Sequence, residues 1–149
     1  ERAISKGNPS LMPRRGYFID TLVAWTKTKD QIVAAEMSQK VLDRMVDLSH
    51  RDYSYRNLRP DAKAYDKVIL AWSRSRHPSA PERIQNLLSE MERQNDAGDH
   101  KMKPILARYT NLMLAWQRSG RKESADEIQQ VFDTLQIQYK TNENKQSLF

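Results

Sequence analysis

The chain contains no cysteine and only four glycines among its 149 residues. Without cysteine there are no disulfides, no thiolate nucleophiles and no zinc sites with sulfur ligands. Neither a glycine-rich phosphate loop nor a nucleophile elbow occurs in the sequence. No apolar run approaches the roughly 20 residues that a membrane-spanning helix requires. Together these absences remove many classes of enzyme and the α-helical membrane proteins.

Histidine is scarce as well, and the three copies are widely separated. His50, His77 and His100 have no spacing typical of metal ligands, and each is expected to be solvated in a turn or loop. Carboxylates are numerous but fall mostly on the polar sides of predicted helices. We therefore expect no enzymatic activity, no metal site and no cofactor.

The charge balance is basic. Lysine and arginine number 25 against 19 aspartates and glutamates, which gives a formal net charge of +6 and a pI of about 9.6. The mean hydropathy of −0.84 fits a thin, polar protein. A basic surface favours a polyanionic partner such as RNA, although many basic proteins bind no nucleic acid.

The tryptophans reveal an internal period. Each follows an alanine and lies twelve residues after a proline, in the pairs Pro13/Trp25, Pro60/Trp72 and Pro104/Trp116. The intervals between successive tryptophans are 47 and 44 residues. A period of this size is typical of stacked helical units. Such stacks serve mainly as extended binding surfaces.

Two apolar stripes recur in each unit. The residues seven, four and three positions before each tryptophan complete a helical stripe, helix A: Phe18, Thr21, Leu22, Tyr65, Val68, Ile69, Tyr109, Leu112 and Met113. A second stripe, helix B, contains Ala35, Ser38, Val41, Leu42, Met45, Pro81, Ile84, Leu87, Leu88, Met91, Ala125, Ile128, Val131, Phe132 and Leu135. Ser79 and Glu82 have the spacing of a capping box at the start of the second helix B. Proline before helix A suits a first helical turn.

These patterns predict an all-α fold, an α-solenoid of three helix-turn-helix repeats with a period of 44–47 residues. The expected helices span 14–28, 30–48, 61–76, 81–95, 105–119 and 122–139. The units are 13–59, 60–103 and 104–139, after an N-terminal extension at 1–12 and before a polar, frayed tail at 140–149. Because a single hairpin cannot bury both stripes, the tryptophans are expected to be buried at the seams between units.

The second and third units carry a recognisable motif. Proline precedes helix A, which contains Tyr65 or Tyr109, an apolar pair and a small residue; helix B carries an apolar pair and then Met91. Over about residues 13–139 this resembles the pentatricopeptide repeat, in an expanded, long-repeat form. The units are longer than ordinary repeats of that family. HEAT-type repeats have a similar period and are the alternative fold.

The resemblance implies a helical-repeat protein that binds single-stranded RNA or ribosomal RNA in mitochondria or plastids, for RNA processing, stability or translation. In that family, two positions per repeat select the base. Here the first position holds Ile19, Asp66 and Thr110, and the second holds Asp61 and Ile105. The isoleucines cannot form hydrogen bonds to a base edge, so ordered base reading is not expected from the complete set.

Basic residues near helix A complete the candidate site. The candidate RNA-binding residues are Arg14, Arg15, Asp61, Lys63, Asp66, Lys67, Arg108 and Thr110. A cation also recurs two places after each tryptophan, as Lys27, Arg74 and Arg118, followed by a hydroxyl residue. This row could bind phosphates. We favour the simpler interpretation that these cations stabilise helix C-termini.

Two functions from different classes remain. The first is RNA binding along the basic helix A surface, which we place ahead. The second is a structural subunit that holds protein partners in a large organellar complex, such as a ribosome or a photosynthetic or respiratory assembly. Three units supply little base selectivity, since stacking contributes only about 1–3 kcal/mol per base.

Overall fold

The computed structural model describes residues 12–147, so the predicted N-terminal extension lies almost entirely outside the described residues. Over this range the chain is all α-helical, with no β-strand. The α-helices are α1 (Arg15–Thr26), α2 (Gln31–Arg51), α3 (Ala62–Ser75), α4 (Ala80–Asp96), α5 (Leu106–Ser119) and α6 (Ser124–Ser147). Two 3₁₀ helices, η3 (Tyr53–Leu58) and η4 (His100–Met102), lie in the longer connections. The six predicted helices therefore form within a few residues of their expected limits, α6 excepted.

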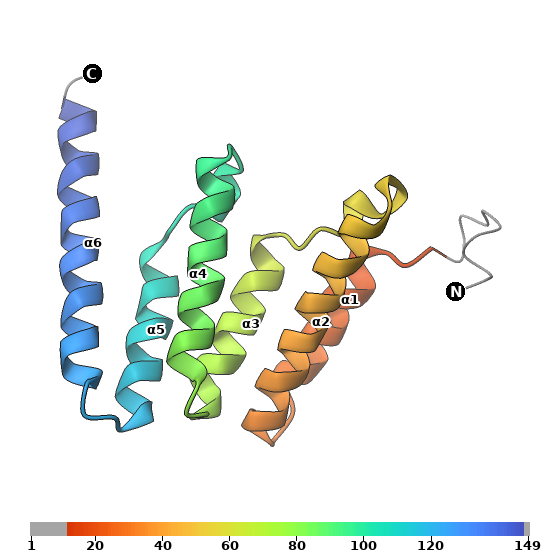
Figure 1. The fold of residues 1–149 in the computed structure, drawn as a ribbon, viewed down its shortest axis with the longest axis horizontal. Helices are drawn as coiled ribbons and strands as arrows, with labels where there is room; N and C mark the ends of the chain where they lie inside the picture. The colour runs from red at the N-terminus through yellow and green to blue at the C-terminus, as the bar shows by residue number, and fades with distance from the viewer. Residues whose placement is uncertain (1–11, 148–149) are drawn as a thin grey trace.

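The helices pack in the order of the chain, and Figure 1 shows them as a row running from α1 and α2 at one end to α6 at the other. Each helix contacts the next one along the chain, and α3 also contacts both α1 and α5. The three helices predicted as helix A thus form a continuous layer, α1–α3–α5. No helix within 12–147 is long and apolar enough to span a membrane.

The starts of α2 and α3 are capped by aspartate side chains. Asp30 accepts hydrogen bonds from the backbone N–H groups of Ile32 and Val33, both at 3.1 Å, and Asp61 accepts one from Ala64 at 3.0 Å. The predicted capping box at Ser79 is wrong, because its side chain makes no capping bond. The backbone N–H of Ser79 instead donates to Nδ1 of His77, which holds the turn before α4 in place.

The hydroxyl residues after two of the tryptophans close their helices. Oγ of Ser75 donates to the Trp72 carbonyl at 2.8 Å, and Oγ of Ser119 donates to the Trp116 carbonyl at 2.7 Å. The next residue in each case is left-handed: Arg76 has φ 55° and Gly120 has φ 63°. Glycine adopts this conformation without a steric penalty, so Gly120 suits its position better than Arg76 does.

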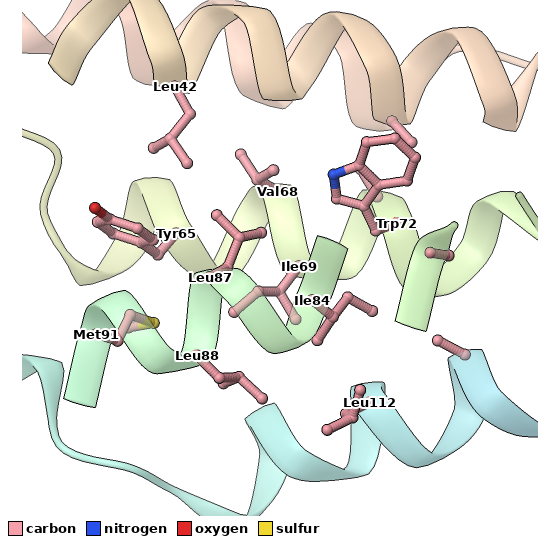
Figure 2. Close-up of a cluster of buried hydrophobic side chains, with 14 of the residues drawn as sticks. Leu42, Tyr65, Val68, Ile69, Trp72, Ile84, Leu87, Leu88, Met91 and Leu112 are labelled. Carbon is pink, nitrogen blue, oxygen red and sulfur yellow. The ribbon is translucent and has the colours of Figure 1, made fainter. Parts of the chain in front are cut away.

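The core lies where consecutive helices face one another. In Figure 2, Leu42 of α2 faces Val68 of α3, while Leu88 of α4 lies on the side next to α5, which carries Leu112. Trp72 is buried between α2 and α3, as predicted for a seam. Its indole N–H donates to the side-chain oxygen of Gln39 on α2 at 2.9 Å.

The first and third units depart from the predicted burial pattern. Trp116 is buried like Trp72, but Trp25 is only partly buried and Thr21 is exposed, because α1 has no helix on its outer side within the described residues. Ala125 and Phe132 of α6 are also exposed. The residues from Lys140 to Ser147 continue α6 rather than forming the expected frayed tail.

The burial difference between Trp72 and Trp25 predicts unequal effects on stability. Replacing Trp72 with alanine is expected to lower the free energy of unfolding by about 3–5 kcal/mol, because a large buried side chain is lost and a cavity remains. The same change at the partly exposed Trp25 should cost clearly less. Urea unfolding followed by circular dichroism measures both. Equal losses of unfolding free energy would show that Trp72 is packed no more tightly than Trp25.

Candidate nucleic-acid interface

The predicted site residues lie on or near the helix A layer, with α3 in the middle. Arg14 and Arg15 are at the start of α1, Asp61 through Lys67 belong to the N-terminal half of α3 and its cap, and Arg108 and Thr110 are in the first turns of α5. The structure therefore gathers them toward the N-terminal ends of neighbouring helices. Their chemical environments differ widely, however.

Arg108 and Asp66 are engaged with each other. Nε of Arg108 donates to Oδ1 of Asp66 at 2.6 Å, and Nη2 donates to Oδ2 at 3.2 Å. Nη1 also donates to the backbone carbonyl of Lys103. Arg108 is only 5% exposed. This arginine therefore joins α5 to α3 and presents no free guanidinium to a phosphate.

The other base-selecting positions also have structural partners or lack polar groups. Asp61 caps α3 and lies 3.9 Å from Nη1 of Arg15. The hydroxyl of Thr110 donates to the Leu106 carbonyl of its own helix at 3.0 Å. Ile19 packs against the apolar core, whereas Ile105 is exposed but has no polar side-chain group. These positions form no row of free base-reading groups.

The motif tyrosines contribute to the interior. The hydroxyl of Tyr65 accepts a hydrogen bond from Nε2 of Gln94 at 3.1 Å, and the hydroxyl of Tyr109 donates to a carboxylate oxygen of Glu92. Burial raises the pKa of both tyrosines, and at Tyr109 the neighbouring Glu92 carboxylate raises it further. Both rings stay neutral at physiological pH and tie helix A to helix B. Neither is a stacking platform for bases.

A basic stripe on α3 remains open to solvent. Lys63, Lys67 and Arg74 lie at i, i+4 and i+11, which places them within one narrow face of the helix, with Leu70 between them. Lys63 and Arg74 are exposed and Lys67 is partly exposed. In the part of the chain that the structure describes, none of the three forms an ion pair. We call this set, Lys63, Lys67 and Arg74, the α3 stripe.

The sequence pointed to Lys63 and Lys67 individually but not to the stripe that they form with Arg74. Arg74 was grouped with Lys27 and Arg118 as the cations that follow the tryptophans. In the structure Arg74 and Arg118 have different environments. Arg118, in the last turn of α5, donates to the Ser73 carbonyl at 2.6 Å and so joins α5 to the C-terminal end of the neighbouring α3. A count along the helix in steps of three and four would have found the stripe.

The remaining basic candidates flank the stripe. Arg14 is exposed at the start of α1. Arg15 is partly exposed, and its Nε donates to the Asn57 carbonyl at 3.0 Å, which links α1 to the connection before α3. Arg14 can therefore extend a basic surface, whereas Arg15 is partly committed to holding this connection.

The histidines lie apart from one another. His77 is partly buried rather than solvated, and its ring packs edge-on against Trp72 with 5.4 Å between the ring centroids. His50 is exposed in the last turn of α2 rather than in a loop, and His100 is exposed in η4. Residues 12–147 contain no group of three or more histidines and carboxylates placed to hold a metal ion.

The ion pair between Asp66 and Arg108 yields a stability prediction. Replacing Asp66 with alanine leaves the buried guanidinium without its carboxylate, and should lower the free energy of unfolding by about 1.5–3 kcal/mol. The matched change Asp20→Ala, at an exposed aspartate of α1, should alter it by less than about 0.5 kcal/mol. Chemical unfolding at neutral pH compares the two. Similar small effects would contradict a structural role for the pair.

Comparison of the chain with protein-family models, curated proteins and solved structures finds no match. The likeness to pentatricopeptide repeats thus depends on the residues of this sequence alone.

Proposed function

We propose that the chain is an α-solenoid of three pentatricopeptide-like repeats that binds single-stranded RNA through its phosphate backbone. Support for the repeat comes from equivalent details in successive units. Ser75 and Ser119 close helix A in the same way, and a left-handed residue follows each of them. Leu42 and Leu88 hold equivalent buried positions on helix B.

The α3 stripe is the observation that carries the RNA proposal. The first and last of its three cations are 11 positions, or about 16 Å along the helix axis, apart at the centre of the helix A layer. Cations without protein partners attract phosphates and release the counterions condensed on them, which makes binding strongly dependent on salt. The exposed Arg14 and Lys27, which flank the two ends of α1, extend the basic surface to the neighbouring helix.

The proposed binding does not read base order. Of the base-selecting positions, Asp66 is held by Arg108, Asp61 caps α3, and Thr110 bonds to its own helix. Phosphate contacts fix the position of a strand but carry no direct sequence information. The resemblance to the family places such an RNA-binding function in organellar gene expression, in mitochondria or plastids.

A structural role within a large organellar complex is the second candidate. The observation that favours it is the apolar surface left uncovered on α6, where Phe132 and Tyr139 are exposed two helical turns apart on the same face. A large exposed apolar patch commonly marks a protein interaction site. In this case the stack would hold protein partners, and the net positive charge would assist contact with ribosomal RNA.

Reversing the charge of the α3 stripe tests the RNA proposal. The triple variant K63E/K67E/R74E should bind a single-stranded RNA oligonucleotide at least about tenfold more weakly than the unmodified chain. If all three side chains contact phosphates, the slope of log K against log salt should also become shallower by about 2. Fluorescence anisotropy over a range of salt concentrations measures both quantities.

The matched control is K101E/K122E/K145E, which changes net charge equally at exposed lysines outside α1, α3 and α5. It should retain most of the affinity. If the two triple variants lose affinity alike, binding reflects overall charge and the assignment to α3 is wrong. If the unmodified chain does not bind RNA even at about 50 mM salt, the structural role replaces RNA binding as the proposal.

The same assay tests whether base order matters. Oligonucleotides of equal length and base composition but different base order should bind with dissociation constants within about tenfold of one another, because phosphate contacts carry no direct sequence information. A preference for one ordered sequence far beyond this range would show that the helix A positions read bases despite their intramolecular bonds.

A further inference from the structure

Within residues 12–147, one face of α6 has no helix packed against it, and its apolar side chains are more exposed than those at the equivalent positions of α2 and α4. Leu42 of α2 and Leu88 of α4 are 2% and 4% exposed, whereas Phe132 at the equivalent position of α6 is 48% exposed. Tyr139, two helical turns after Phe132, adds a second exposed large apolar side chain on the same face. A stack that ended in solvent would present a polar outer face here.

The two earlier units show what kind of element covers this face. Helix α3 lies over α2, with Val68 facing Leu42, and α5 lies over α4 (Figure 2). Both covering helices carry a tyrosine, apolar residues three and four positions later, and a tryptophan at the seventh position. The uncovered face of α6 thus corresponds to the faces of α2 and α4 that α3 and α5 cover. We call this face, around Phe132, the helix seat.

The open face is also hollow. A cavity of about 500 Å³ opens there between the N-terminal end of α5 and the middle of α6, lined by Leu106, Met113, Phe132, Leu135 and Tyr139 among others. Among the described residues that line it, Lys140 alone is charged. Apolar walls of this size suit large apolar side chains such as tyrosine or tryptophan. Such walls present few groups that could bind a polyanion.

We propose that this face of α6 binds an amphipathic α-helix of a protein partner, and that this helix presents an aromatic residue, an aliphatic pair three and four positions later, and a second aromatic residue at the seventh position. The partner helix continues the stack as α3 and α5 do. A second copy of this chain is a poorer occupant. Its α1 would present the polar, exposed Thr21 where α3 has Val68 and α5 has Leu112.

A peptide with the sequence of residues 60–76, acetylated and amidated at its ends, supplies the stripe as a probe. We expect the full chain to bind the labelled peptide, and the Phe132→Asp variant to bind it at least about tenfold more weakly. The control Thr134→Asp adds the same charge at an exposed position two residues away on α6, and should bind like the unmodified chain. Val68→Asp in the peptide should also abolish binding.

Each other outcome would overturn the proposal. If the unmodified chain does not bind the peptide, the face is not a helix seat. If the chain binds but Phe132→Asp leaves binding unchanged, the peptide occupies another site, such as that of α3 after displacing it. A Phe132-dependent dimer in sedimentation without peptide would identify a second copy as the occupant. RNA affinity should change by less than about twofold in Phe132→Asp; a large loss would assign the face to RNA.

Discussion

Each helix in this protein depends on the next for burial of its apolar stripe. A helical hairpin alone leaves one stripe in water, and the gain of about 25 cal/mol per Å² of buried apolar surface is realised only when neighbours stack. Leu42 is buried because α3 follows α2, and Leu88 is buried because α5 follows α4. This dependence gives the molecule its linear order (Figure 1) and exposes a surface wherever a neighbour is missing.

Polar bonds across the seams then fix how the helices are aligned. Trp72 bonds to Gln39 on α2, Arg108 binds Asp66 on α3, and Arg118 bonds to the Ser73 carbonyl. Apolar contacts alone have little direction, whereas a bidentate arginine–carboxylate pair imposes a defined geometry. Asp66 and Arg108 were both candidates for contact with RNA. Their use in alignment explains why the proposed RNA contact depends on unpaired lysines rather than on the residues that resemble base-reading positions.

The local periodicity of the sequence was sufficient to predict the helices and most of the core. The stripes around Trp72 and Met91 repeat at helical spacing, and both residues are buried as expected. Proline and aspartate before α3 marked its start correctly. These features depend on residues within a few helical turns along the sequence. A repeating pattern of residue types reports on interactions over that distance.

Features that depend on distant partners could not be predicted in this way. Arg108 was an RNA candidate because its position is basic and near the motif tyrosine; only the packing of α5 on α3 brings it to Asp66, 42 positions away. Ser79 has the spacing of a cap, yet the ring of His77 takes its backbone N–H. The end of α6 was predicted too early because polar residues such as Thr141 and Asn144 do not stop a helix by themselves.

The two proposed surfaces differ in position and in the force that would act on them. The α3 stripe lies on the central helix of the layer and would act through charge, which salt screens over about 10 Å at 0.1 M. The seat around Phe132 lies on the last helix and would act through apolar burial, which salt does not screen. Because they share no residue, occupation of one leaves the other open. A stack built this way can hold an RNA strand on one layer while its end joins a protein partner, so the two candidate roles are physically compatible in one chain.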